Sequence, residues 1–240
     1  DAIALCDALP ENSIHAVVTD PPYGLIEYDK KNLDKRRSGR GGVWRIPPSF
    51  DGAKRAPLPR FTVLSADELT ALSAFFCDFA RSVERILVPG GHVFIASNPL
   101  LSTMTFNAFE QSGLEKRGEI IRLVQTLRGG YKPKGSEVDF PDVSVMPRSC
   151  FEPWGLFRKP FKGTVAANLK QWGAGGLRRA ENGDPFKDVI VCSPMRGNEK
   201  KLAPHPSLKP QRFMRQIVRA SLPLGIGCVL DPFAGSGSTL

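Results

Sequence analysis

A short acidic and proline-rich motif near the start of the sequence combines residue types that could hold a planar amine. It reads Asp20-Pro21-Pro22-Tyr23 and follows the apolar, β-branched run Ala16–Thr19, which predicts a buried strand. Prolines cannot donate to a sheet ladder, so the pair stiffens the backbone just beyond the strand and leaves carbonyl oxygens unpaired. A carboxylate and a carbonyl can accept the two hydrogens of an NH2 group, and a tyrosine ring can stack on a flat heterocycle. The motif therefore predicts an amine site at the carboxyl end of a strand, where open α/β sheets bind ligands. A plain Pro-Pro turn with an exposed tyrosine is the alternative.

A glycine-rich loop at the far end of the chain could approach a nucleoside closely. It runs from Asp231 to Thr239 as Asp-Pro-Phe-Ala-Gly-Ser-Gly-Ser-Thr, directly after the short apolar run Cys228–Leu230, a predicted strand. It is not a phosphate-binding Walker A loop, because no Gly-Lys-Ser/Thr follows, and it lacks the third glycine of a dinucleotide fingerprint. The loop therefore favours a nucleoside that carries an amino-acid tail, with an ordinary glycine turn as the alternative.

The two motifs gain meaning together, because each is an aspartate with a rigid loop at the end of a predicted strand. If the two strands are neighbours at the switch point of one sheet, a single crevice holds a nucleoside cofactor at 231–237 and a planar amine at 20–23. That arrangement suits a methyl donor beside an exocyclic amino group.

Hydrophobic periodicity predicts the elements that must position these motifs. A capping box at Ser65–Glu68 opens an amphipathic helix that extends to about Leu87 and ends at Pro89-Gly90-Gly91. Alternating strands and helices along the chain favour a parallel sheet. The further predicted elements are strands at 92–96, 119–127, 189–192 and, weakly, 154–158, and helices at about 100–111 and 210–221.

Composition narrows the partners and the compartment. The formal charge of +9 and the pI near 9.5 favour a polyanionic partner. Five scattered cysteines without Cys-x-x-Cys spacing predict idle thiols, with neither a disulfide nor a zinc site, and the three histidines show no metal-ligand spacing. No apolar run is long enough to cross a bilayer and no signal peptide opens the chain, so we expect a cytoplasmic protein with no metal and no membrane contact.

The order of the motifs resembles that of class beta amino-methylating DNA methyltransferases, which act on adenine N6 or cytosine N4. In that class the Asp-Pro-Pro-Tyr motif comes before target recognition and the glycine loop of the cofactor site comes last. The matching pieces are Asp1 with 9–13, 19–24, 88–94, 151–159, 205–210 and 229–239. The resemblance implies an α/β fold: a circularly permuted, Rossmann-like S-adenosylmethionine-dependent methyltransferase sheet with an inserted target-recognition region.

The resemblance also assigns parts of the chain. It implies a catalytic part at 1–127 that includes a basic loop at 25–62, a target-recognition insertion at 128–204 and a cofactor-binding part at 205–240. Residues 25–62 are rich in Lys, Arg, Gly and Pro, and a solvated flexible loop is the alternative there. The class continues beyond the glycine loop with a helix and an acid-bearing strand, and has a glycine before the acid matched by Asp1. We therefore expect a chain that is incomplete at its C-terminus.

Residue roles follow from the same resemblance. In the catalytic motif, Asp20 accepts a hydrogen bond from the target NH2, the carbonyl of Pro21 shares that amine, Pro22 stiffens the turn and Tyr23 stacks on the flipped base. The S-adenosylmethionine pocket is expected to involve Asp231, Pro232, Phe233, Gly235, Gly237 and Thr239. The segment that packs on the methionine end contains His205, Ser207 and Lys209, and Asp1 stands near the cofactor adenine.

The implied reaction is direct methyl transfer to an amino group of double-stranded DNA, in a restriction–modification setting. Methylation at cytosine C5 needs a nucleophilic cysteine, and none of the five cysteines follows a proline as in that family. Aspartate at position 20 favours adenine N6, because the cytosine N4 enzymes more often carry serine there. Three alternatives stay open: cytosine N4, an RNA or protein amide substrate, and an inactive DNA-binding remnant. The oligomeric state is open too, with a homodimer as one option.

Overall fold

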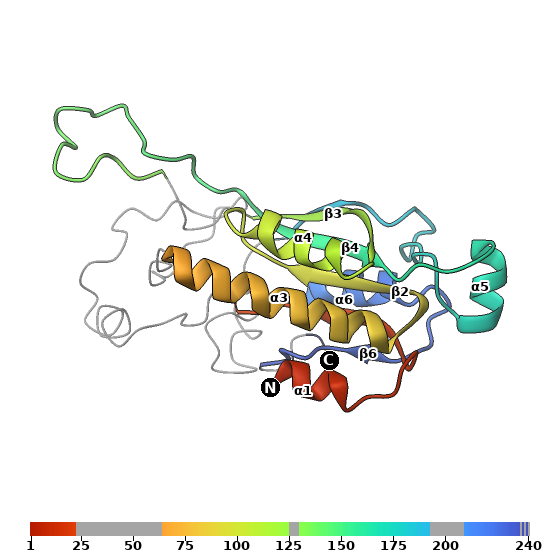
Figure 1. Cartoon of the computed structure of the whole chain (residues 1–240). Coiled ribbons are helices and arrows are strands. Elements are labelled where there is room, and N and C mark those ends of the chain that lie inside the picture. The colour runs from red at the N-terminus through yellow and green to blue at the C-terminus, as the bar shows by residue number, and fades with distance from the viewer. Residues whose placement is uncertain (23–63, 125–129, 193–208, 236, 238, 240) are drawn as a thin grey trace.

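The computed structural model describes residues 1–22, 64–124, 130–192, 209–235, 237 and 239 (Figure 1). The basic loop predicted at 25–62 lies outside the described residues. The helices are α1 (Ala2–Asp7), α3 (Ala66–Ile86), α4 (Ser102–Gln111), α5 (Val165–Trp172) and α6 (Gln211–Ser221). The strands are β1 (Ile14–Thr19), β2 (Leu87–Ala96), β3 (Glu115–Leu123), β4 (Phe151–Arg158), β5 (Val189–Val191) and β6 (Val229–Leu230).

One six-stranded sheet, in the order β5-β3-β4-β2-β1-β6, forms the centre of the structure. Strand β1 lies between β2 and β6 and is parallel to both, with Val17 opposite Val93 on one side and Leu230 on the other. The carboxyl ends of β1 and β6 therefore lie at the same edge of the sheet. This edge carries Asp20 and Asp231, so the predicted neighbourhood of the two strands is confirmed.

The sheet is mixed, whereas the sequence favoured a parallel one: β1 is parallel to β2 and β6, but β4 is antiparallel to both β2 and β3. Parallel neighbours need a crossover, usually a helix, whereas antiparallel neighbours do not. The alternation of strands and helices stops after β3, since no helix is found between β3 and β4 in the described part of that connection.

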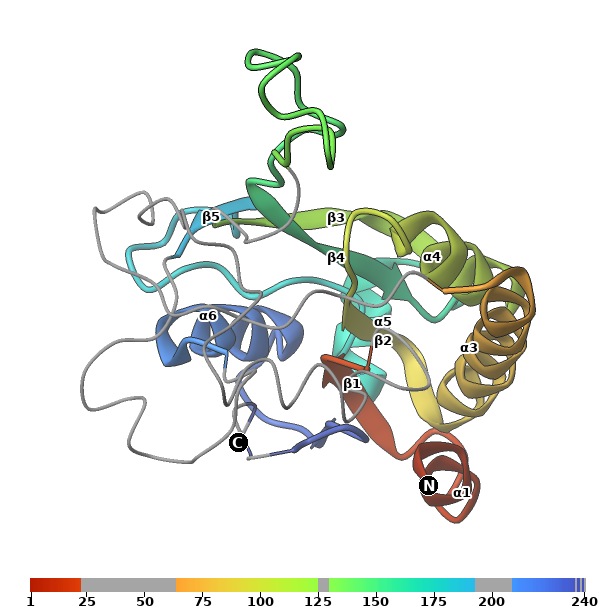
Figure 2. The ribbon, with the colours of Figure 1, turned by 90° about the vertical axis from the view of Figure 1, so that its left-hand side faces the viewer.

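Helices cover the two faces of the sheet unequally (Figure 2). Helices α1, α3 and α4 lie on one face, where Phe79 and Phe109 pack with Val17, Val93 and other inward residues of the strands. Helix α6 lies on the other face, where Phe213 packs against Val18 and Trp154. Neighbouring residues of β1 thus point into two different cores, which explains the unbroken apolar run Ala16–Val18 in this strand. No helix in the described part of the chain is long and apolar enough to span a membrane.

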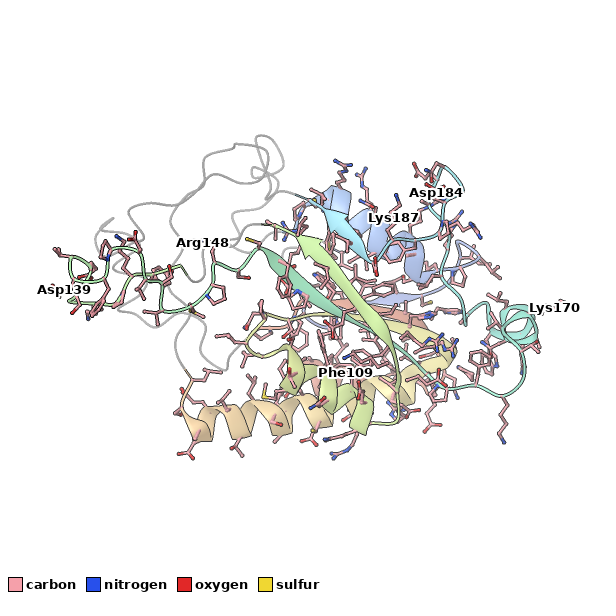
Figure 3. The ribbon with its side chains drawn as sticks, turned by 90° about the horizontal axis from the view of Figure 1, so that it is seen from above. Phe109, Asp139, Arg148, Lys170, Asp184 and Lys187 are labelled. Carbon is pink, nitrogen blue, oxygen red and sulfur yellow. The ribbon has the colours of Figure 1, made fainter. Side chains whose placement is uncertain are left out.

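The region predicted as an insertion, 128–204, is not separate from the sheet. Strand β4 lies between β2 and β3, and β5 lies at the sheet edge beside β3. Between β3 and β4, a long arm projects from the body, with Asp139 at its far end (Figures 1 and 3). Two hydrogen bonds close the base of this arm, from Gly130 N to Met146 O and from Val145 N to Tyr131 O. Target recognition by residues 128–204 stays a prediction.

Candidate active site

Asp20 lies immediately beyond β1, at the carboxyl edge of the sheet. Thr19 is fully buried, Asp20 and its side chain are partly exposed, Pro21 is buried and Pro22 is exposed. The strand ends there because the two prolines cannot continue its hydrogen-bond ladder. Tyr23 lies outside the described residues, so its stacking role stays a prediction.

Lys209 is the residue that meets Asp20. Its Nζ lies 2.9 Å from Asp20 Oδ2 and 3.0 Å from Glu152 Oε2, and its side chain is only 10% exposed. Pro210, the next residue, is the N-cap of α6, so the packing of that helix on the sheet fixes the backbone from which Lys209 extends. The resemblance assigned Lys209 to the cofactor segment, whereas the structure places its ammonium group on the proposed catalytic carboxylate.

Glu152 continues this chain of charges into the sheet. Its Oε2 also accepts a hydrogen bond from Arg122 Nη1 at 3.2 Å, and its Oε1 accepts one from Trp154 Nε1 at 2.8 Å. Arg122 on β3 and Glu152 on β4 are partners in the antiparallel register, which brings the two side chains together. We call Asp20, Lys209, Glu152 and Arg122 the buried ion-pair chain; its charges alternate in sign and sum to zero.

The ionisation of the two central members follows from their partners. Burial disfavours the charged form of Glu152, but Lys209 and Arg122 outweigh it and hold the pKa at about 2. Burial also disfavours the Lys209 ammonium, but Asp20 and Glu152 outweigh it and raise the pKa of Lys209 above its ordinary value. Both groups therefore stay charged at neutral pH.

Asp231 organises the glycine loop and ties it to β1. Its Oδ1 accepts hydrogen bonds from Thr19 Oγ1 at 2.6 Å and from Phe233 N at 3.1 Å, and its Oδ2 accepts one from Thr239 Oγ1. Gly235 and Gly237 have φ values of 52° and 78°, in the left-handed region that favours glycine. The loop therefore curves back over Asp231, and Thr19 joins it to the strand that carries Asp20.

The remaining expected cofactor residues lie in different settings. The Phe233 ring packs edge-on against Phe79 at 5.3 Å between centroids, so it anchors the loop to α3, and Pro232 precedes it in the same partly buried turn. Asp1 is the N-cap of α1 and accepts a hydrogen bond from Ile3 N. Ile3 packs against the same core cluster as Phe233, which places α1 and the loop on one side of the sheet. His205 and Ser207 lie outside the described residues.

Sequence reasoning did not assign roles to Thr19, Arg122, Glu152 or Trp154. The available signal was a charged residue among apolar neighbours, Arg122 within 120–124 and Glu152 within 151–157, since a buried charge needs a partner. The segment containing Glu152 was matched to the methyltransferase class, but nothing in the sequence shows that β4 lies beside β2 and reaches Lys209.

Comparisons with known proteins give the context of this site. A family model described as DNA methylase matches residues 147–240. Type II methyltransferase M.HindIII of Haemophilus influenzae (strain ATCC 51907 / DSM 11121 / KW20 / Rd) is 27% identical over 270 residues, which cover 100% of this chain and 84% of that protein. The chain is therefore similar to DNA methylases over residues 147–240 and to a type II methyltransferase over its whole length.

Solved structures share the fold of this chain. TTHA0409 from Thermus thermophilus, complexed with S-adenosyl-L-methionine, superposes with a TM-score of 0.54 at 20% identity, over 100% of this chain and 80% of that one. PvuII DNA methyltransferase (cytosine-N4-specific) superposes with a TM-score of 0.57 at 15% identity, over 100% of this chain and 74% of that one.

S-adenosylmethionine is the ligand of the similar TTHA0409 complex, and the residues at the sheet edge of this chain fit such a cofactor. The loop after β6 has glycines at its two left-handed positions, so its backbone is open to close approach by a ligand. Asp231 accepts hydrogen bonds from the hydroxyls of Thr19 and Thr239, and these bonds hold the loop in shape. Among the described residues, no group of three or more His, Cys, Asp or Glu side chains could hold a metal ion.

Proposed function

We propose that this protein transfers the methyl group of S-adenosylmethionine to N6 of adenine in double-stranded DNA. The observation that carries the proposal is the position of Asp20, at the end of β1 and beside the β6 strand that leads into the cofactor loop. A carboxylate there can accept a hydrogen bond from an amine held next to the methyl donor. The excess of basic residues suits a DNA substrate. We propose that the protein acts in the cytoplasm.

The chain's own residues explain how a weak nucleophile could react. The lone pair of an exocyclic amine is delocalised into its ring, so the free amine attacks poorly. Hydrogen bonds from both N–H groups, one to Asp20 and one to the Pro21 carbonyl, favour a pyramidal nitrogen with a localised lone pair. Bound S-adenosylmethionine supplies a methyl group on a sulfonium, and alignment of the nitrogen with that methyl group provides much of the rate. As the N–CH3 bond forms, the S–CH3 bond would break and leave a neutral thioether, and the methylated nitrogen would then lose a proton to solvent. No covalent bond to the protein is needed.

Adenine is preferred to cytosine because of the residue type at position 20. Aspartate there resembles the adenine N6 enzymes of class beta, in which a flipped adenine presents its 6-amino group. Cytosine N4 is the competing acceptor, since it offers the same amino chemistry and the same two hydrogen-bond donors.

The proposal is tested by incubating the protein with S-adenosylmethionine labelled on its methyl group and with duplex DNA, then digesting the DNA to nucleosides. We expect label in N6-methyldeoxyadenosine. Label in N4-methyldeoxycytidine would move the acceptor to cytosine. DNA binding without label would favour an inactive DNA-binding protein instead.

Replacing the acceptor carboxylate tests the role of Asp20. Asp20→Ala removes one of the two groups that hold the target amine, so we expect the methylation rate to fall at least about 100-fold. Asp78→Ala is the matched control, because Asp78 is an exposed carboxylate of α3 that pairs with Arg81. A normal rate in Asp20→Ala would refute the mechanism.

A further inference from the structure

We propose that Glu152 is a positioning residue for methyl transfer: through the Lys209 ammonium, it holds the Asp20 carboxylate in the orientation that receives the target amine. The inference rests on the proposed function. It adds Glu152 to the acceptor motif, although Glu152 belongs to another strand and lies 132 positions after Asp20 (152 − 20) in the sequence.

Glu152 is built as a fixed anchor. Its three hydrogen bonds come from three different residues, with Trp154 on Oε1 and with Arg122 and Lys209 on Oε2. Trp154 is fully buried and packs edge-on against Phe213 of α6, at 5.3 Å between ring centroids. Arg122 lies over the same Phe213 ring, with its guanidinium carbon 5.6 Å from the centroid. Two of the three groups that hold Glu152, Trp154 and Arg122, are therefore themselves held against Phe213 in the core between the sheet and α6.

Lys209 transmits that fixed position to Asp20. One ammonium group bridges the two carboxylates at 2.9 Å and 3.0 Å, so movement of Glu152 would move the group that binds Asp20 Oδ2. Asp20 is the most exposed member of the buried ion-pair chain, at 22% of its side chain, whereas the other three are 7–16% exposed. The chain thus runs from a rigid core to the one carboxylate that can meet a ligand.

The cost of burial argues that the chain serves more than stability. Taking paired charges out of water is expensive, and well-packed apolar residues often replace a buried ion pair without loss of stability. Four alternating charges that end at the acceptor carboxylate instead provide preorganisation, since a carboxylate held in place needs no reorganisation during the reaction.

The decisive variant is Glu152→Gln, which keeps the shape and removes one charge. Lys209 and Arg122 then share a neutral amide oxygen, the chain carries a net positive charge, and Lys209 draws Asp20 away from the amine. We expect the single-turnover rate constant of methyl transfer, at saturating cofactor and DNA, to fall about 10- to 100-fold. The Kd values for S-adenosylmethionine and DNA should change less than about threefold, because neither ligand needs Glu152 for binding. Glu119→Gln, an exposed glutamate of β3 paired with Lys116, is the matched control.

A second measurement keeps folding and function apart. We expect the nitrogen-15 signal of the Lys209 ammonium to shift in both Asp20→Asn and Glu152→Gln, and Lys209→Arg to retain more activity than Lys209→Met. The positioning role would be overturned if Glu152→Gln transferred the methyl group at the wild-type rate. It would also be overturned if the Lys209 signal were unchanged in that variant. A loss fully explained by a lower folded fraction would overturn it too. If the wild-type protein methylates no DNA, the proposed function fails and takes the positioning role with it, while the ammonium signal still reports whether the three groups are coupled.

Discussion

Two aspartates at neighbouring strand ends have opposite environments, and this difference separates their roles. Asp231 receives hydrogen bonds from two hydroxyls and a backbone amide, all from the chain itself, which makes it a structural centre of the loop. Asp20 instead faces a lysine whose charge is balanced by Glu152. The first aspartate shapes the cofactor loop, and the second keeps its charge within reach of a substrate.

His92 provides a prediction about pH and stability. Burial, together with the charges of Arg158 and Arg117, lowers the pKa of His92 to about 3. A histidine in the unfolded chain has a pKa near 6.5, so between about pH 6.5 and pH 3 the unfolded state binds a proton that the folded state does not bind. The contribution of neutral His92 to the free energy of unfolding is therefore complete above about pH 6.5. It is lost as the pH falls towards 3, by up to about 1.4 kcal/mol per pH unit.

We expect the free energy of unfolding, measured with urea, to fall by about 2 kcal/mol more between pH 7 and pH 5 in the wild type than in His92→Gln. Glu152 does not contribute to this difference, because its pKa of about 2 places its loss of stability below pH 4.5. Parallel curves for the wild type and His92→Gln would contradict the prediction.

At the scale of elements, local signals were predictable and long-range ones were not. Helix α3 begins at the predicted capping box, with both reciprocal Ser65 and Glu68 hydrogen bonds present, because that signal lies within four residues. Strand β4 was predicted only weakly, since Pro153 and Gly155 interrupt its pattern, yet its partners on both sides make it internal to the sheet. Those partners are distant in sequence, and register between them is set by packing that a local pattern does not contain.

Helix α5 was not predicted, and its attachment to β2 gives a testable case. Asn168 of α5 is buried and its Nδ2 donates to Pro89 O at 2.9 Å and to Ala174 O at 2.8 Å. Gly90, with φ of 79°, makes room for this side chain, because a Cβ there would lie 2.4 Å from the same Nδ2. The Pro-Gly-Gly sequence predicted to end a helix therefore lies within β2, where it accommodates α5.

We expect Asn168→Ala to lower the free energy of unfolding by about 2–3 kcal/mol, because one buried carbonyl group and one partly buried carbonyl group lose their donor. Urea denaturation measures this loss. Methyl transfer below the unfolding transition should stay close to the wild-type rate, since Asn168 belongs to the attachment of α5 and not to the buried ion-pair chain. Asn182→Ala, at an exposed turn where the side chain meets Asp184, should cost far less. Equal losses in the two variants would show that α5 is not held in this way.

At the scale of the whole molecule, two distant motifs form one site. Their aspartates, Asp20 and Asp231, lie 211 positions apart (231 − 20) in the sequence. The sequence predicted an aspartate at each strand end, because each strand and its turn are local. That the two strands are neighbours was a hypothesis, and the β1–β6 pairing bears it out. The sequence did not predict the hydroxyl that joins them. Thr19 is fully buried, and its Oγ1 donates to Asp231 Oδ1 at 2.6 Å across the β1–β6 pair.

This hydrogen bond joins β1, which carries the amine site, to the cofactor loop. Its removal should therefore weaken cofactor binding, although Thr19 is not part of that loop. Thr19→Val keeps the volume, leaves Asp231 without its β1 donor and should raise the Kd for S-adenosylmethionine, measured by calorimetry, about 5- to 20-fold. The cofactor should then raise the Tm of the variant less than that of the wild type at equal concentration, because stabilisation by a ligand depends on its ratio to Kd. Thr105→Val, at a buried threonine of α4, should change the Tm without changing the Kd. An unchanged Kd in Thr19→Val would mean that the loop holds its shape without β1, and that the two halves of the site are joined only by the sheet.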